Sequence, residues 1–64
     1  MVSLNSAEKI AKSAGADRVS KSFKEKLKEV LENYGKELSE KSIKFASYKG
    51  RSTIRKEDLE NALR

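Results

Sequence analysis

The chain has 64 residues, no cysteine and no histidine, and its 15 lysines and arginines outweigh 10 acidic residues to give a net charge of +5. A chain this short is expected to form one domain, residues 1–64, whose small core rarely stabilises itself alone. Disulfides and the usual zinc sites need cysteine or histidine, and no calcium-type acidic loop occurs, so we expect no metal. Oligomerisation is therefore the expected source of additional stability.

The composition also limits location and chemistry. No apolar run approaches the roughly 20 residues that cross a bilayer, and the N-terminal MVSLNSAEK lacks the apolar core of a signal peptide. We therefore expect a cytoplasmic protein with no membrane partner. There is no glycine-rich phosphate loop and no acidic pair in an evident apolar pocket, which predicts neither an enzyme nor a cofactor or small-molecule substrate.

The first predicted helix begins at Asn5, with Glu8 completing a capping box, and ends at Gly15. It is nine or ten residues long and has one narrow apolar stripe, formed by Ala7, Ile10, Ala11 and Ala14. Residues 16–20 form a connection. Ser20 can cap the helix that follows, and Ser22 with Glu25 is a competing capping box.

The second predicted helix, residues 21–48, is the dominant element. Its apolar positions step by threes and fours without a proline: Phe23, Leu27, Val30, Leu31, Tyr34, Leu38, Ser42, Phe45 and Ala46. Gly35 costs up to about 1 kcal/mol in such a helix, which suggests a close helix crossing or simple drift at one site. Gly50 terminates the helix, whose length is about 42 Å at 1.5 Å per residue.

The third predicted helix covers residues 56–63, with acidic residues near its start and an apolar face of Leu59, Ala62 and Leu63. Two short helices cannot cover the whole apolar stripe of the long one. The uncovered part must meet another copy or another protein, so the sequence predicts an obligate dimer whose long helices cross.

Positive charge is concentrated between the second and third helices. The stretch from Lys49 to Lys56 has four cations and no anion, which favours an anionic partner. The few aromatic residues all have core spacing, so no loop offers a base-stacking platform, and no side chains form a major-groove reading set. Lys24, Lys26 and Lys28 alternate with Glu25 and Glu29 and are expected to form a surface laced with ion pairs.

Two blocks resemble prokaryotic histones of the archaeal type, a family that includes minimal bacterial histones. AEKIAKSAGADRVSKS (7–22) is similar to their first helix and first loop, and GRSTIRKEDL (50–59) to their second loop and third-helix start. The family pattern of arginine, any residue, threonine, four residues and aspartate falls on Arg51, Thr53 and Asp58. The resemblance implies an all-α histone fold and a head-to-tail dimer. In that dimer, Thr53-Ile54 forms a short parallel strand with residues near Val19 of the partner.

The resemblance also implies sites for double-stranded DNA. Arg18 matches the arginine that enters the minor groove; from the residues alone it could equally be a solvated arginine or a partner of Asp17. Arg51 and Asp58 match a structural pair that ties the second loop to the third helix. Ser52 stands where several members carry lysine. The expected DNA-binding residues are Lys9, Lys12, Arg18, Ser20, Lys21, Lys49, Arg51, Ser52, Thr53, Arg55 and Lys56.

Higher assembly is the point at which the sequence departs from the family. Family members that wrap DNA join dimers through positions that match Phe45, Tyr48, Asp58 and Asn61. Tyr48 replaces the usual histidine, and Asn61 replaces a usual leucine. We therefore expect a homodimer or one discrete tetramer rather than an endless polymer.

The expected function is DNA binding and compaction without sequence specificity, in the nucleoid, through paired basic loops and first-helix N-termini, with an affinity that falls steeply with salt. The alternative is a histone-fold interaction subunit that heterodimerises with another histone-fold chain. A membrane-surface helix is a third possibility, but the stripe lacks tryptophan and no long basic face is segregated.

Overall fold

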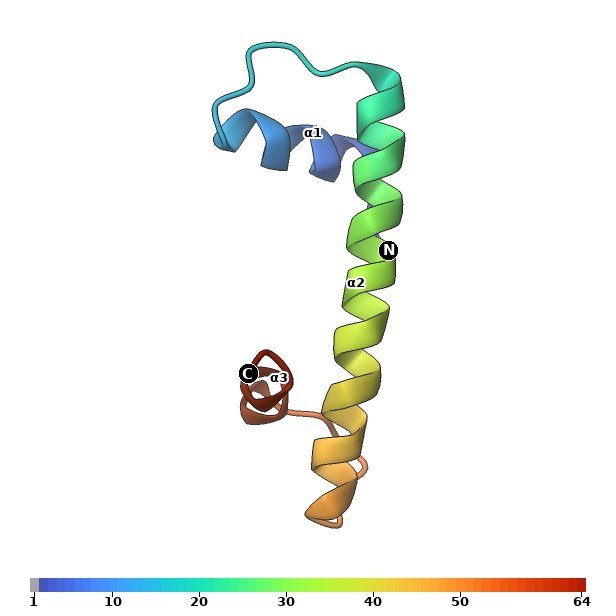
Figure 1. Ribbon diagram of the computed structural model, residues 1–64, viewed down its shortest axis with the longest axis vertical. Coiled ribbons are helices and arrows are strands. Elements are labelled where there is room, and N and C mark those ends of the chain that lie inside the picture. Colours follow the sequence, from blue (N-terminus) through green and yellow to red (C-terminus); the bar gives the residue numbers. More distant parts are fainter. Residues whose placement is uncertain (1) are drawn as a thin grey trace. The chain divides into compact units, whose positions relative to one another are not determined.

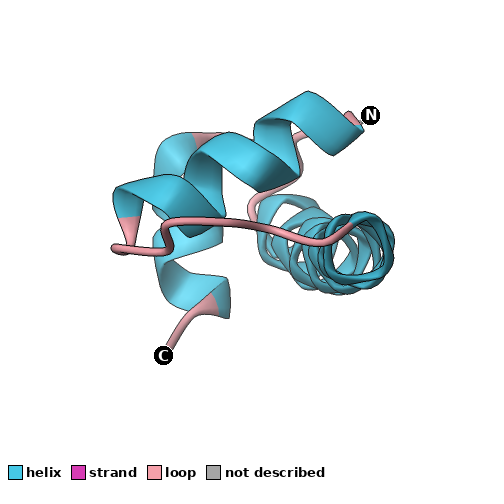
Figure 2. Cartoon of the chain, turned by 90° about the horizontal axis from the view of Figure 1, so that it is seen from above, coloured by secondary structure: helices cyan, strands magenta, loops and turns pink. Residues whose placement is uncertain are grey.

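The computed structural model describes residues 2–64, and the regular structure of this part of the chain is entirely helical (Figure 2). Helix α1 spans Leu4–Ser13, α2 spans Lys21–Tyr48 and α3 spans Lys56–Ala62. The prediction of an all-α chain with a short, a long and a short helix is confirmed. Residues 53–54 are not in a strand in the single chain; the expected strand needs a partner to pair with.

Helix α2 has the predicted bounds and 28 residues (Figure 1). It runs through two compact units, one ending at Asn33 and the other beginning at Tyr34. The first unit holds α1 and the N-terminal part of α2. The second unit holds the C-terminal part of α2 together with α3, and each unit is described below by itself.

The start of α1 differs from the prediction. Its N-cap is Ser3, whose hydroxyl accepts a hydrogen bond from the backbone N–H of Ser6 at 3.1 Å. The predicted capping box of Asn5 and Glu8 is therefore wrong, because Asn5 lies inside the helix. Serine and asparagine cap about equally well, so the local signal could not choose between them. The earlier start adds a helical bond from the Ala7 N–H to the Ser3 carbonyl, at 3.1 Å.

The start of α2 follows the prediction. The Ser20 hydroxyl accepts from the backbone N–H of Phe23 at 3.1 Å, and the Ser20 carbonyl accepts from the N–H of Lys24. Ser22 lies inside the helix, so the competing capping box with Glu25 does not start it. Ser20 thus fixes where the preceding connection becomes helical.

Helices α1 and α2 end in the same backbone turn. Gly15 has a φ of 111° and Gly50 a φ of 71°, a left-handed conformation that suits glycine. The N–H of the residue after each glycine reaches back five residues, from Ala16 to Ala11 at 3.2 Å and from Arg51 to Ala46 at 3.0 Å. This is the Schellman arrangement, and it sets the direction in which both connecting loops leave their helices.

Few side chains are buried within the chain. The buried apolar residues are Ala7, Ala11, Ala46 and Ala62, and the buried polar ones are Ser42 and Asp58. Large apolar side chains stay exposed instead: Ile10, Phe23, Val30, Tyr34, Ile43, Tyr48, Ile54, Leu59 and Leu63. Several of them belong to the apolar stripe of α2, which the described chain therefore leaves largely uncovered.

Candidate nucleic-acid interface

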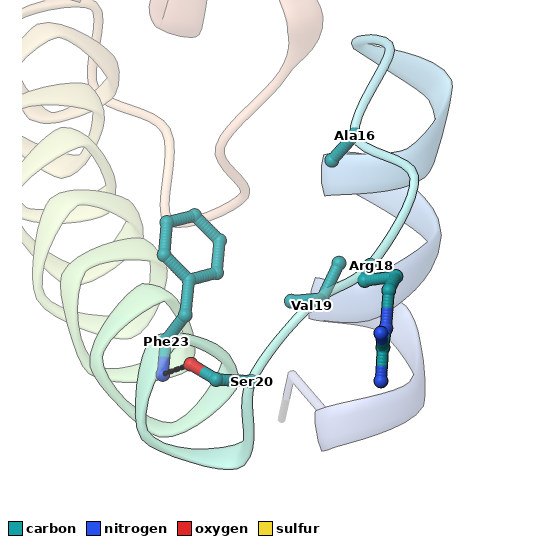
Figure 3. A pocket seen from close by; sticks show the side chains of 5 residues that line it. All are labelled: Ala16, Arg18, Val19, Ser20 and Phe23. Atoms are coloured by element: carbon teal, nitrogen blue, oxygen red, sulfur yellow. Dashed lines mark hydrogen bonds between the residues drawn. The ribbon is translucent and has the colours of Figure 1, made fainter.

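Loop 1, residues 14–20, connects α1 to α2 and presents Arg18 to solvent. Arg18 forms no ion pair with the described residues, and a local pair with Asp17 does not occur. Figure 3 shows that its side chain points away from Phe23. The guanidinium of Arg18 is therefore available to an outside anion.

Beside Arg18, loop 1 and the start of α2 form an open, largely apolar pocket. It has a volume of about 310 Å³ and is lined by Ala16, Arg18, Val19, Ser20 and Phe23 (Figure 3). Phe23 is half exposed. Such a hollow suits a short apolar segment rather than a charged group.

Loop 2, residues 49–55, is fixed by the carboxylate of Asp58. Arg51 Nη1 donates to Oδ2 and Nη2 donates to Oδ1, each at 3.1 Å, and the Arg55 backbone N–H donates to Oδ2 at 2.8 Å. Arg51 Nη1 also donates to the Thr53 carbonyl at 3.1 Å. The hydrogen bonds from Arg51, helped by the Arg55 backbone, hold the pKa of Asp58 below its usual value.

A second carboxylate, that of Glu57, contacts two loop 2 cations. Glu57 Oε1 lies 3.0 Å from Arg51 Nη2 and 3.8 Å from Lys49 Nζ. Arg51 is thus held by two acidic residues and is mostly buried, whereas Lys49 stays half exposed. This geometry gives Arg51 a structural role and leaves it little freedom to reach a phosphate.

The other predicted contact residues divide between the two units. Lys9, Lys12, Ser20 and Lys21 lie with Arg18 in the first unit, and all are exposed. In the second unit the exposed residues are Lys49, Ser52, Thr53, Arg55 and Lys56. Each unit therefore offers its own exposed cluster of cations and hydroxyls.

Sequence reasoning missed one ion-pair cluster in the first unit. Glu8 Oε1 lies 3.3 Å from Lys12 Nζ, and Glu8 Oε2 lies 3.7 Å from Lys24 Nζ. Hydrogen bonding to Lys12 and the charge of Lys24 lower the pKa of Glu8. The i, i+4 spacing of Glu8 and Lys12 was a readable signal. The contact with Lys24 joins two helices, and no local pattern predicts it.

The predicted dimer–dimer residues do not all lie on one surface. Phe45 and Tyr48 pack edge to face with ring centroids 6.2 Å apart. Together with Asn61 they line an open pocket of about 310 Å³ whose other residues are Lys41, Lys44, Ala62 and Arg64. Asp58 is fully buried by its own chain, so its carboxylate is not exposed to a second dimer. Its inclusion among these contact residues is therefore corrected.

Comparison with known proteins identifies the family. Residues 4–63 match the family described as histone-like transcription factor (CBF/NF-Y) and archaeal histone. The chain belongs to this histone-fold family. The match covers all three helices and both loops, and the family is one of DNA-binding chromatin proteins rather than enzymes.

Two curated histones are similar over most of their length. The chain is 37% identical to the archaeal histone HAN1 of Thermococcus zilligii over 57 residues, which are 89% of this chain and 85% of that protein. It is 39% identical to probable archaeal histone 3 of Methanocaldococcus jannaschii over 56 residues, 88% of this chain and 84% of that protein. The resemblance seen in the two sequence blocks is therefore confirmed.

Nothing in the described part of this histone competes with a DNA site. Across residues 2–64, no three acidic, histidine or cysteine side chains are grouped as a metal site. No helix within that range is long and apolar enough to span a membrane.

Proposed function

We propose that this histone binds and compacts double-stranded DNA without sequence preference, as a head-to-tail dimer that uses both loops and the N-termini of α1. The observation that carries the proposal is Arg18, an exposed loop arginine with no partner among the described residues. Arginine suits the minor groove, whose negative potential attracts a planar cation. Arg51 differs, since its guanidinium is already held by Asp58 and Glu57.

The uncovered apolar side chains support the dimer. Val30 and Tyr34 are 48% and 53% exposed although they belong to the apolar stripe of α2. A single chain gains little from burying four alanines, because burial scales with apolar area. A second copy that lays its own α2 across this stripe would bury both faces at once.

The pocket beside Phe23 supports a head-to-tail arrangement. It is open and largely apolar, and Ile54 of loop 2 is 43% exposed. In the proposed dimer, loop 2 of one chain lies beside loop 1 of the other, so Ile54 fills this pocket. The same step brings Arg18 of one chain next to Thr53 of its partner and forms one composite DNA site at each end of the dimer.

Low sequence specificity follows from the kinds of side chains that the loops present. The exposed loop residues are cations and hydroxyls, which contact phosphates and sugars and carry no sequence information directly. The protein would act in the cytoplasm, on the nucleoid. It would assemble as a dimer or one discrete tetramer, since Asn61 makes the surface around Phe45 and Tyr48 more polar.

The test is fluorescence anisotropy with two unrelated duplexes of roughly 40–60 base pairs, titrated across salt. We expect similar affinities for both duplexes. We expect Arg18→Ala to weaken binding about tenfold and to reduce the salt slope by roughly two per dimer, one for each arginine removed. Lys36→Ala removes one exposed cation outside the loops and serves as the matched control. Absence of binding at low salt would overturn the proposal.

The second candidate is a subunit that pairs with a different histone-fold chain. The observation that favours it is the family description, which includes histone-like transcription factors as well as archaeal histones. The uncovered stripe of α2 would accept such a partner equally well. Sedimentation equilibrium of the purified chain separates the two candidates: a stable homodimer supports the DNA-binding proposal, and a monomer that folds only with a second chain supports the alternative.

A further inference from the structure

Three of the cations expected to bind DNA are already neutralised by two glutamates. Glu8 pairs with Lys12, and Glu57 pairs with Lys49 and Arg51. Each glutamate contacts two cations, because Glu8 also reaches Lys24 on α2. The two acidic residues thus have equivalent positions, one beside the cations of each unit.

These ion pairs are open to solvent and can exchange partners. The side chains of Glu57 and Lys49 are 55% and 49% exposed, and that of Lys12 is 54% exposed. Exposed pairs of this kind are weak and are screened by salt. A DNA phosphate can therefore replace the glutamate at such a lysine, but it must displace a carboxylate that stays covalently fixed nearby.

We propose that Glu8 and Glu57 act as built-in counter-ions that limit the DNA affinity of this histone. The inference rests on the proposed DNA-binding function and names the residues that tune it. A lysine paired with a glutamate has no condensed anion to release and gains little from a phosphate. The remaining carboxylate also repels the incoming phosphate, which is of like charge.

The two glutamates differ in how much they restrain. Removing the Glu8 charge frees Lys12 and Lys24, which have no other ion partner among residues 2–64. Removing the Glu57 charge frees mainly Lys49, because Arg51 keeps its two bonds to Asp58. Glu8 is therefore the stronger restraint of the two.

The experiment compares Glu8→Gln and Glu57→Gln with wild type in the same anisotropy titration. Glutamine keeps the size and polarity of the side chain and removes only its charge. We expect Glu8→Gln to tighten binding about threefold to tenfold at low salt, and Glu57→Gln by a smaller factor, with the gain shrinking as salt rises. The salt slope of Glu8→Gln should steepen by roughly two or more per dimer, because each chain gains free cations.

The matched control is Glu37→Gln. Glu37 pairs with Lys41 at 3.5 Å with the same i, i+4 spacing as Glu8 and Lys12, and neither residue belongs to the expected DNA site. An equal gain in Glu37→Gln and Glu8→Gln would mean that net charge alone sets the affinity, and this would overturn the inference.

Folding and function are kept apart by two further readings. Circular dichroism of each variant at the temperature of the titration shows whether it is folded. If Glu8→Gln is unfolded, Glu57→Gln alone still tests the inference, and no gain in affinity for that variant would overturn it. Failure of the proposed function looks different, because wild type itself would then not bind DNA.

Discussion

Arg51 and Asp58 form a two-pronged ion pair within one chain, with two parallel N–H···O bonds of 3.1 Å. Asp58 is fully buried, and its oxygens also accept the Arg55 backbone N–H. The pair joins the beginning of loop 2 to the first turn of α3. The conformation of loop 2 therefore depends on a contact between residues seven apart in the sequence and not on the loop residues alone.

The first prediction concerns the shape of this ion pair. Lysine carries a single ammonium and cannot form the fork that arginine offers to a carboxylate. We expect Arg51→Ala to lower the midpoint of thermal unfolding by roughly 10 °C, and Arg51→Lys by about half as much. Circular dichroism melts at one fixed protein concentration measure both. Arg55→Lys is the control, since the Arg55 side chain has no ion partner in the described chain; a loss equal to that of Arg51→Lys would contradict the prediction.

The second prediction concerns acid. Hydrogen bonds from Arg51 lower the pKa of Asp58 in the folded chain, whereas an unfolded aspartate has a pKa of about 3.9. Stability from this group is therefore complete above about pH 4 and is lost as the pH falls through the lower, folded pKa. We expect the free energy of unfolding to fall steadily below about pH 4, and part of that slope to be missing in Asp58→Asn.

Glu8 contributes to the same acid transition at a slightly higher pH. Its pKa is lowered chiefly by the hydrogen bond to Lys12, and an unfolded glutamate has a pKa of about 4.3. Urea unfolding at a series of pH values measures both contributions. Acid slopes that are identical in wild type, Asp58→Asn and Glu8→Gln would show that neither carboxylate stabilises the fold.

Local signals in the sequence predicted the parts of the fold that depend on single residues. The limits of α2 were predictable because Ser20 caps one end and Gly50 ends the other. The start of α1 was not, because Ser3 and Asn5 are two adequate caps two residues apart. A cap signal gives a boundary only where one candidate is present.

The candidate site was predictable in composition but not in pairing. The exposed cations of both loops could be named from the sequence. The contact of Glu8 with Lys24 could not, because it depends on how α1 packs against α2. The same is true of the complete burial of Asp58, which removes it from the surface.

The third prediction concerns the apolar stripe of α2. Val30 is half exposed in the single chain, so a glutamate there would be harmless to a monomer. In a dimer it would place a charge in an apolar interface at a high cost. We expect the unfolding midpoint of wild type to rise with protein concentration, as it does for dimers, and Val30→Glu to be unfolded or monomeric.

The control for this third prediction is Lys36→Glu, which adds a negative charge at an exposed position of the same helix. It should leave the sedimentation coefficient unchanged. A concentration-independent melt together with a folded Val30→Glu would show that the stripe is not a dimer interface.

The fourth prediction concerns the surface around Phe45 and Tyr48. Asn61 lines the pocket beside these two rings, and its amide makes the pocket less favourable to a second dimer. We expect Asn61→Leu to shift the protein from dimers toward tetramers in sedimentation velocity at micromolar concentration, because leucine adds apolar area to the contact. Glu60→Leu adds the same side chain at an exposed position that does not line this pocket. If both leucine variants associate equally, general stickiness explains the result; if neither does, dimers of this histone meet through a different surface.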